Sequence, residues 1–352
     1  MQLRIPGPTP LPEPVRAAGS RQMINHRGAA FHDLLREVTE GIKHFYQTSH
    51  DLLIFPASGT GGLEAAIVNC FAPGDVVLGL SAGHFGDRFA DIAAAYGLQV
   101  LRLQFEWGQP IEPERVRACL AEHPDIRGVL LTHNETSTGV QHPVEAIGAL
   151  TRERDVLLLV DSVSALGAVD LRVDAWDVDV AITASQKAWM TPPGLTMLSV
   201  SPRAWDAHGR ATLPRYYFDF GAARKHAEHW ETPSTPAVSL LFQLQAALQL
   251  MTEEGREAVF ARHDMLRNYV RERVRHIGLE LLAADPCASR TVTALVLPDA
   301  RQVQSDLRRH GVELAGGQGP LEGRLLRIGH MGWVTREDMA QVLDLLADRV
   351  AG

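Results

Sequence analysis

The sequence predicts an α/β protein with a large domain built on a mainly parallel seven-stranded sheet and a smaller C-terminal α+β domain. Between residues 50 and 202, seven short apolar runs alternate with segments of helical period. Continuous apolar strands separated by helices are typical of a parallel sheet that is covered on both faces. After residue 277 the pattern becomes a mixture of short strands and helices, and 352 residues are enough for two cores.

The chain begins with a predicted arm. Residues 1–20 contain five prolines and show no helical or strand period, which predicts an extended segment that needs a surface to lie on. A neighbouring subunit is one candidate for that surface.

The large domain is predicted to occupy residues 21–255. Its expected strands are residues 52–55, 76–80, 100–105, 128–132, 156–161, 180–184 and 196–200, and its expected connecting helices include 62–71, 87–96, 112–122 and 143–153.

The smaller domain is predicted to occupy residues 256–352. Two strongly helical stretches, 237–251 and 257–276, span the junction between the domains. Strands are then expected at 291–297 and 324–328, with a helix at 300–310 between them. A closing helix runs to Val350, and Thr335 is its expected N-cap.

Composition excludes several classes of protein. The net charge is −8 with acidic and basic residues mixed along the chain, so we expect neither a nucleic-acid groove nor a membrane-facing patch. The N-terminus has no long apolar run, and a cytoplasmic protein is expected. The three cysteines are scattered without metal-ligand spacing, so neither a disulfide framework nor a metal site is expected.

One lysine stands out. Lys and Arg total 34, yet only Lys43, Lys187 and Lys225 are lysines, and arginine cannot form an imine. Lys187 follows an apolar strand in a turn rich in Ser, Gln, Pro and Gly, and loops at strand carboxyl ends are where α/β sheets place ligands. Partial desolvation there would lower its pKa and make it a nucleophile and a base. A surface lysine in a loop is an equally open interpretation of this segment alone.

Asp161 ends another apolar strand, 26 residues before Lys187. A buried carboxylate needs a partner. The protonated pyridine nitrogen of pyridoxal phosphate is one such partner, because an aspartate keeps that nitrogen charged. An aspartate that caps the next helix or binds a metal remains the alternative.

Two further segments carry weaker signals. The run from Ala57 to Ala65, with Ser58, Gly59 and Thr60, follows a predicted strand and opens a helix, which suits a phosphate, although many glycine turns merely cap helices. Arg327, on a strand before Gly-His-Met-Gly, has the geometry to clamp a carboxylate through two donors; a solvated surface arginine is the alternative.

Taken together and in this order, these motifs resemble the class V, fold-type-I aminotransferases that depend on pyridoxal phosphate, of the alanine–glyoxylate and serine–pyruvate or serine–glyoxylate type. The resemblance covers nearly the whole chain. The segments that carry it are residues 6–10, 25–28, 58–61, 133–139, 160–163, 185–187, 192–195 and 327–332.

The resemblance implies a role for each matching residue. Lys187 would form the Schiff base with pyridoxal phosphate and Asp161 would pair with its ring nitrogen. Val163 and Phe85 would pack on the two ring faces, and Thr136 would hydrogen-bond the ring hydroxyl. Ser58, Gly59, Thr60 and Gln186 would hold the phosphate, together with Thr235 from a partner subunit, and Arg327 would bind the substrate carboxylate. The resemblance therefore implies a homodimer, with the arm crossing its interface. It also implies transfer of an amino group from a small amino acid (alanine, serine or aspartate) to glyoxylate or pyruvate.

Two alternatives remain open at this point. A lyase of the same fold, such as a cysteine desulfurase, needs a mobile nucleophilic cysteine, and Cys287 is the only loop candidate. A catalytically silent subunit is the second alternative, because a fold does not fix a function. The histidines of the segment 226–229 do not have the spacing of a zinc motif.

Overall fold

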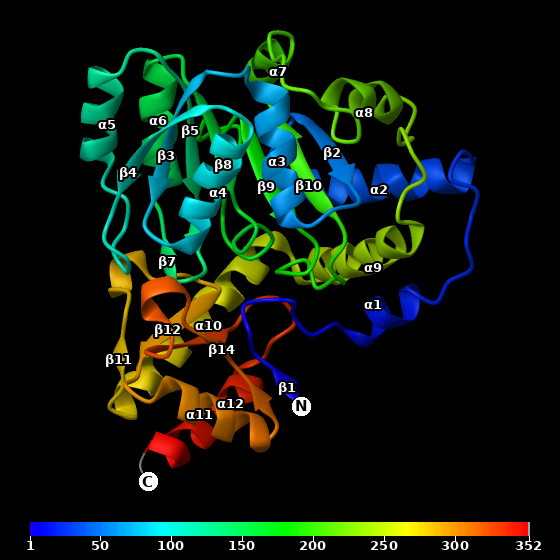
Figure 1. Cartoon of the computed structure of the whole chain (residues 1–352). Helices are drawn as coiled ribbons and strands as arrows, with labels where there is room; N and C mark the ends of the chain where they lie inside the picture. Colours follow the sequence, from blue (N-terminus) through cyan, green and yellow to red (C-terminus); the bar gives the residue numbers. More distant parts are fainter. Residues whose placement is uncertain (351–352) are drawn as a thin grey trace.

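A seven-stranded sheet forms the centre of the computed structural model, which describes residues 1–350 (Figure 1). The strand order is β2-β10-β9-β8-β5-β3-β4, and β10 alone runs antiparallel to its neighbours. All seven predicted strands form, and the mainly parallel sheet is confirmed. The bounds are β2 (Asp51–Phe55), β3 (Val76–Ser81), β4 (Gln99–Gln104), β5 (Ile126–Thr132), β8 (Leu157–Asp161), β9 (Val180–Ala184) and β10 (Thr196–Val200).

Helices cover both faces of this sheet because its strands are apolar on both sides. Along β8, Leu158 and Val160 belong to one hydrophobic core, whereas Leu157 and Leu159 belong to the other. The first core is closed by α2 (Ala29–Tyr46), α5 (Pro113–Glu122), α6 (Val144–Glu153) and α9 (Val238–Glu254). The second is closed by α3 (Gly59–Cys70), α4 (His84–Ala95), α7 (Pro202–His208) and α8 (Phe220–Ala227).

The C-terminal region has its own antiparallel sheet and its own core. The sheet order is β11-β12-β15-β14, and α10 packs against α12 beside it. Thr335 caps the last helix as expected, since its Oγ1 accepts the N–H of Asp338 at 3.1 Å while the Asp338 carboxylate accepts the N–H of Thr335 at 2.9 Å. The bounds are α10 (Arg256–His276), β11 (Glu280–Leu281), β12 (Val292–Val296), α11 (Ala300–Arg309), β13 (Val312–Glu313), β14 (Ala315–Gly316), β15 (Leu325–Gly329) and α12 (Arg336–Val350).

The N-terminal arm differs from its prediction in one way. It contains a helix, α1 (Glu13–Ala18), which forms because Val15 and Ala18 bury themselves against α9. Its first residues contact this chain: β1 (Gln2–Leu3) pairs with β13, and Thr9 donates its N–H to the carbonyl of Gln186 at 3.1 Å. The contact of the arm with a second subunit stays a prediction. The domain limits 21–255 and 256–352 stay predictions.

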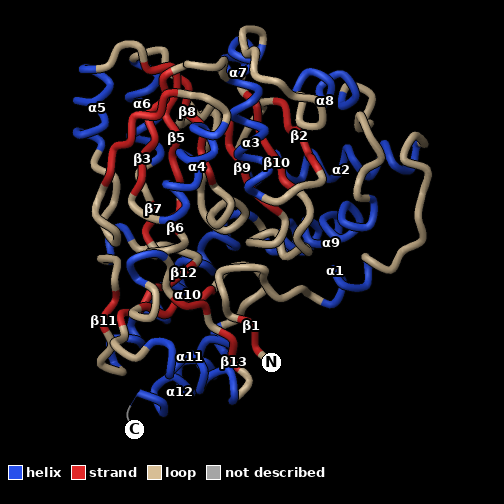
Figure 2. The backbone as a smooth tube through the Cα atoms, viewed as in Figure 1, coloured by secondary structure: helices blue, strands red, loops and turns tan. Residues whose placement is uncertain are grey.

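The two regions meet across loops. Figure 2 shows loops, in tan, between the seven-stranded sheet and the C-terminal region, and the arm passes through the same zone. These loops follow the carboxyl ends of β5, β8 and β9. Within residues 1–350, no helix has both the length and the apolar character that a membrane span requires.

Candidate active site

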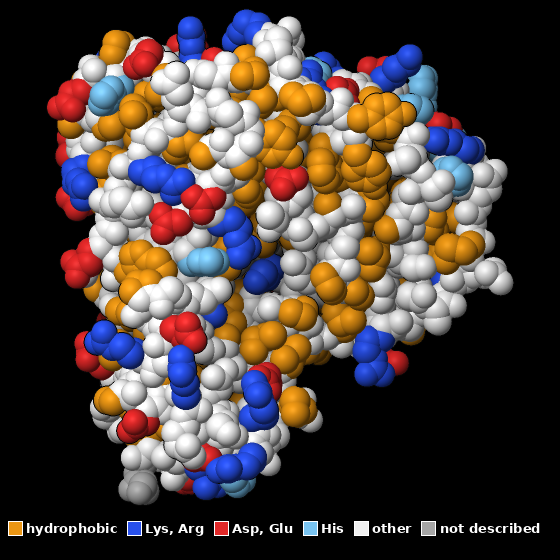
Figure 3. All heavy atoms as spheres, viewed as in Figure 1, with side chains coloured by type: hydrophobic (Ala, Val, Ile, Leu, Met, Phe, Trp, Pro, Cys, Tyr) orange, Lys and Arg blue, Asp and Glu red, His pale blue; other side chains and the backbone are white. Residues whose placement is uncertain are grey.

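A cavity of about 230 Å³ lies at the carboxyl ends of the sheet strands. The face shown in Figure 3 is hollowed near its middle, where Lys or Arg atoms come into view. A larger cavity of about 400 Å³ opens at the opposite, amino ends of the strands and contains none of the predicted site residues. The smaller cavity is lined by nine of them, namely Ser58, Gly59, Thr60, Phe85, Thr136, Asp161, Val163, Gln186 and Lys187, and by Leu63, Arg88, Asn134 and Ser164.

Lys187 projects into this cavity from the turn after β9. The turn is fixed by Ser185, whose Oγ donates to the carbonyl of Pro192 at 2.7 Å and accepts the N–H of Leu195 at 3.2 Å. The lysine amine donates to the carbonyl of Pro6 in the N-terminal arm. Burial, reinforced by the nearby positive charge of Arg327, lowers the pKa of Lys187 to about 8. A larger fraction of this amine is therefore neutral near pH 8 than in a solvent-exposed lysine.

Asp161 ends β8, the strand next to β9, and is only 5% exposed. One of its carboxylate oxygens accepts the N–H of Val163 at 3.0 Å. Burial, with a smaller contribution from the negative charge of Glu135, raises the pKa of Asp161 to about 6. Its other oxygen makes no hydrogen bond with residues 1–350, so a cationic group in the cavity would satisfy both its charge and its acceptor.

Residues 58–62, which we call the glycine turn, pack tightly at the start of α3. Ser58 is the N-cap, and its Oγ accepts the N–H of Gly61 at 3.4 Å. A β-carbon on Gly59 would lie 2.6 Å from Val163, and one on Gly62 would lie 2.2 Å from the hydroxyl of Thr196, so neither position has room for a side chain. The backbone N–H groups at this helix N-terminus suit a phosphate.

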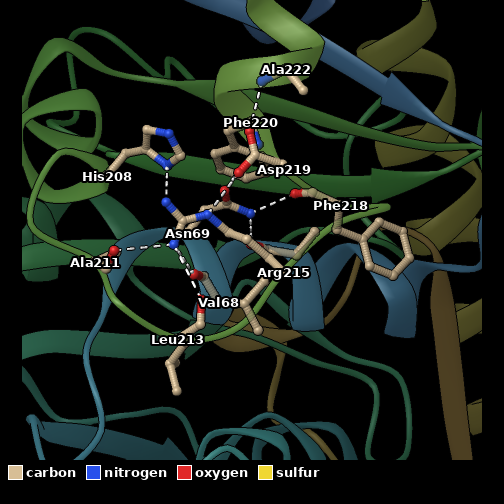
Figure 4. A network of polar contacts seen from close by, with 11 residues as sticks. Val68, Asn69, His208, Ala211, Leu213, Arg215, Phe218, Asp219, Phe220 and Ala222 are labelled. Carbon is tan, nitrogen blue, oxygen red and sulfur yellow. Dashed lines mark hydrogen bonds and ion pairs between the residues drawn. The ribbon is translucent and has the colours of Figure 1, made fainter. Parts of the chain in front are cut away.

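A polar network anchors the far end of α3 (Figure 4). The side-chain amide of Asn69 donates to the carbonyl of Phe218 at 2.6 Å, and its Oδ1 accepts the N–H of Phe220 at 2.9 Å. Arg215 donates to the carbonyl of Val68 at 3.1 Å and to the carboxylate of Asp219 at 3.0 Å. This network holds the loop that carries Phe218. The Phe218 ring lies 3.3 Å from the position that a β-carbon on Gly61 would take, so the ring packs against the glycine turn.

Phe85 is positioned by a buried carboxylate to which sequence reasoning assigned no role. Glu135 accepts the N–H groups of Phe85 and Gly86, each at 3.1 Å, and Ser137 accepts the N–H of His84 at 3.1 Å. Burial raises the pKa of Glu135. Arg88, also missed, lies over the Phe85 ring at 4.7 Å and lines the cavity. Its position three residues after Phe85 on a predicted helix places both side chains on one face, and this was the sequence signal that could have identified it.

Arg327 lies on β15, is 7% exposed and does not itself line the cavity, but it contacts Thr136, which does. Its Nε donates to the carbonyl of Gly316 at 2.9 Å, and one terminal nitrogen donates to the carbonyl of Thr136 at 3.1 Å and to the side-chain oxygen of Gln318 at 3.2 Å. Thr136 also donates its hydroxyl to Ser164 at 2.7 Å. Burial lowers the pKa of Arg327 to about 10.

Two further candidates, Thr235 and Cys287, do not line the cavity either. Thr235 is exposed, as a residue that acts on a partner subunit would be in a single chain. The segment that contains Thr235 is linked to residues 25–28, because Arg27 forms an ion pair with Glu231 at 2.8 Å. Cys287 does not line the cavity, and burial raises the pKa of its thiol, which disfavours the thiolate that a lyase would need.

The residues present fit pyridoxal phosphate. A largely buried lysine lies with a buried carboxylate that lacks a cationic partner, an aromatic ring and a helix N-terminus in one cavity. The side-chain oxygens of Gln186 and Asn134 are also buried there without hydrogen-bond partners among residues 1–350. Within that range, no three His, Cys, Asp or Glu side chains are grouped so as to hold a metal ion. Fold and site together define a pyridoxal-phosphate enzyme of the fold-type-I class.

The comparisons with known proteins specify the family. The family model described as aminotransferase class-V matches residues 13–330, and the chain belongs to that family of pyridoxal-phosphate-dependent transaminases. It is 43% identical to a protein of Synechococcus named soluble hydrogenase, small subunit, over 98% of this chain and 91% of that one. It is 38% identical to the L-aspartate–glyoxylate aminotransferase of Paracoccus denitrificans, over 94% and 86%. The crystal structure of an alanine–glyoxylate aminotransferase from Nostoc has a TM-score of 0.94 at 33% identity, over 99% and 95%.

Proposed function

We propose that this enzyme transfers the amino group of a small amino acid, such as alanine, serine or aspartate, to glyoxylate or pyruvate through a Schiff base on Lys187. The observation that carries the proposal is the shared cavity of Lys187 and Asp161, with Arg327 in contact with Thr136 of its lining. The relatives from Paracoccus and Nostoc, which are named for aspartate, alanine and glyoxylate, support this substrate class.

Each side chain has a role that follows from its position. Pyridoxal phosphate, when bound, supplies an aldehyde for the amine and an electron sink for the substrate carbon. Asp161 keeps a proton on the ring nitrogen, and the N–H groups of the glycine turn hold the phosphate. Lys187, whose lowered pKa leaves much of it neutral near pH 8, takes a proton from the substrate carbon and returns it. Arg327 holds the substrate carboxylate and fixes which face of that carbon meets the lysine.

The test of this proposal is Lys187→Ala. Turnover and the yellow colour of the lysine-bound cofactor should be lost together, while Lys225→Ala, which changes an exposed lysine, should leave both unchanged. A Lys187→Ala variant that transaminates at the wild-type rate would overturn the assignment. The donor is then identified by adding alanine, serine or aspartate singly and following the loss of the yellow colour.

A subunit without turnover is the second candidate, and the observation that favours it is the name of the Synechococcus relative. The two proposals predict different results. A transaminase loses its yellow colour when the correct amino acid is added and recovers it with a 2-oxo acid. A silent subunit stays yellow, or colourless, with every amino acid tested.

We also propose that the enzyme works as a homodimer in the cytoplasm. The exposed segment around Thr235, fixed by the Arg27–Glu231 ion pair, supports a phosphate contact made to a partner subunit. Sedimentation of the holoenzyme at several concentrations tests the dimer, and fractionation of cells with an antibody to the chain tests the compartment.

A further inference from the structure

Two of the three nitrogens of the Arg327 guanidinium already donate hydrogen bonds within this chain. Its Nε and one terminal nitrogen donate to backbone carbonyls, those of Gly316 in β14 and of Thr136 in the turn after β6 (Asn134–Glu135). The same terminal nitrogen also donates to the side-chain oxygen of Gln318 at 3.2 Å. The second terminal nitrogen makes no hydrogen bond with residues 1–350. A carboxylate that binds in the forked geometry uses parallel N–H groups on two nitrogens, so beside the free nitrogen it needs a donor on one that is already in use.

Only one of these three acceptors is free to move. The carbonyl of Gly316 is fixed by the pairing of β14 with β15, and that of Thr136 lies in a buried turn. Gln318 is a half-buried side chain in the connection 317–324, between Gly317 and Gly319. Gly319 has a φ of +53°, in the left-handed region that favours glycine. Release of Gln318 is thus the side-chain movement that gives a carboxylate two donors on Arg327.

We propose that the side-chain oxygen of Gln318 holds, in the free enzyme, the place on Arg327 that one oxygen of the substrate carboxylate takes. Gln318 is then a specificity-determining residue. A ligand with a full carboxylate gains two charge-assisted hydrogen bonds and displaces it, whereas an amide, an ester or a simple amine offers a single neutral acceptor and does not. This inference rests on the proposed function and narrows its substrates to free α-carboxylic acids.

The fluorescence of Trp107 should report the displacement of Gln318. A β-carbon on Gly319, next to Gln318, would lie 3.0 Å from the indole of Trp107, so the connection that carries Gln318 rests on this half-buried ring. Movement of the connection changes the surroundings of Trp107. Its fluorescence should therefore respond to a bound carboxylate, and the response should be absent in Trp107→Phe.

The experiment measures binding of propanoate and of propanamide to the yellow holoenzyme, since neither carries an amine that can react. Wild type should bind propanoate with a change in Trp107 fluorescence and reject propanamide. Gln318→Ala removes the competing acceptor and should bind propanoate about two- to tenfold more tightly, as expected for one lost hydrogen bond. Gln318→Glu places a carboxylate on Arg327 and should weaken propanoate binding about tenfold or more. Gln302→Ala, on the exposed face of α11, is the matched control and should behave as wild type.

The possible outcomes are distinct. If Gln318→Ala and Gln318→Glu both bind propanoate as wild type does, or if Gln318→Ala binds it more weakly, the displacement is refuted. If Arg327→Ala also binds propanoate normally, the carboxylate site of the proposed function fails instead. Tighter binding in Gln318→Ala with weaker binding in Gln318→Glu supports the inference, and a smaller preference of Gln318→Ala for propanoate over propanamide supports its role in specificity.

Discussion

The carboxylate of Glu135 accepts the backbone N–H of Phe85 at 3.1 Å, and it holds the first turn of α4 against the loop after β5. The same carboxylate accepts the N–H of Ser137 at 3.1 Å and contacts its hydroxyl at 2.5 Å. Glu135 is 1% exposed, so its charge is balanced by these donors instead of by water. The aromatic wall of the cavity is thus set by a residue that does not itself line the cavity.

Glu135→Ala should therefore weaken the cofactor site from a distance. The change leaves several buried N–H groups unpaired, at a cost of about 1–3 kcal/mol for each group that finds no water. Urea unfolding should show lower stability, and cofactor affinity, measured by the yellow absorbance during titration, should fall. Glu135→Gln keeps an acceptor and should lose less. Glu145→Ala, on an exposed face of α6, is the control, and equal behaviour of the Ala variants at 135 and 145 would contradict this role.

Asp161→Asn should change the pH dependence of stability of the cofactor-free protein. The folded pKa of about 6 is above the ordinary 3.8, so between these values the folded state binds more protons than the unfolded state. The wild-type free energy of unfolding therefore falls as pH rises through this window, by up to about 3 kcal/mol for a shift of about two pH units. Asparagine does not titrate. The variant should gain in stability relative to wild type between pH 4 and pH 7 in urea unfolding, and a constant difference would show that Asp161 is not strained by burial.

Lys187 should react with the cofactor at unusually low pH. An amine with a pKa of about 8 is half neutral at pH 8, whereas at the ordinary 10.5 the neutral fraction would be roughly 300-fold smaller than the charged one. The rate of yellow colour formation, when pyridoxal phosphate is added to cofactor-free protein, should rise with pH and level off above about 8. A rate that keeps rising to pH 10 would mean that the amine is solvated before the cofactor arrives.

Thr235 should act on the other subunit. Thr235→Ala alone should weaken cofactor binding about tenfold, as expected for one lost hydrogen bond to a charged phosphate. A hybrid dimer of Lys187→Ala and Thr235→Ala chains should then contain one intact site, formed by Lys187 of one chain and Thr235 of the other. The purified hybrid should have about half the wild-type activity, at a cofactor concentration that leaves the Thr235→Ala homodimer largely empty. No recovery, with hybrid formation shown by a tag on one chain, would place Thr235 in its own site or in none.

Much of the fold was predictable because local patterns determined it. The strands β8 and β9 are apolar except at Thr183 and the final Asp161, which identified buried parallel strands, and Thr335 was recognisable as a cap from its place before α12. Helix α1 was missed because its five-proline surroundings carry no periodic signal, and it is stabilised by packing on α9. The site residues that could be predicted follow strand ends or occupy motif positions. Asn134 and Glu135 received no role because their importance depends on neighbours far away in the chain, whereas Arg88 had a local signal, its place three residues after Phe85, that was not used.

The sequence by itself determined the class of fold, because strand and helix patterns are local features of the chain, and its ordered motifs, through their resemblance to the class V aminotransferases, indicated the cofactor and the lysine. Tertiary structure alone decided the properties of those groups. The pKa values of Lys187 and Asp161 depend on burial and on charges from other segments, and the acceptors on Arg327 come from two distant segments, Thr136 after β6 and Gly316 with Gln318 before β15. Such terms arise only when distant segments fold together and exclude water, so they are absent from any local pattern.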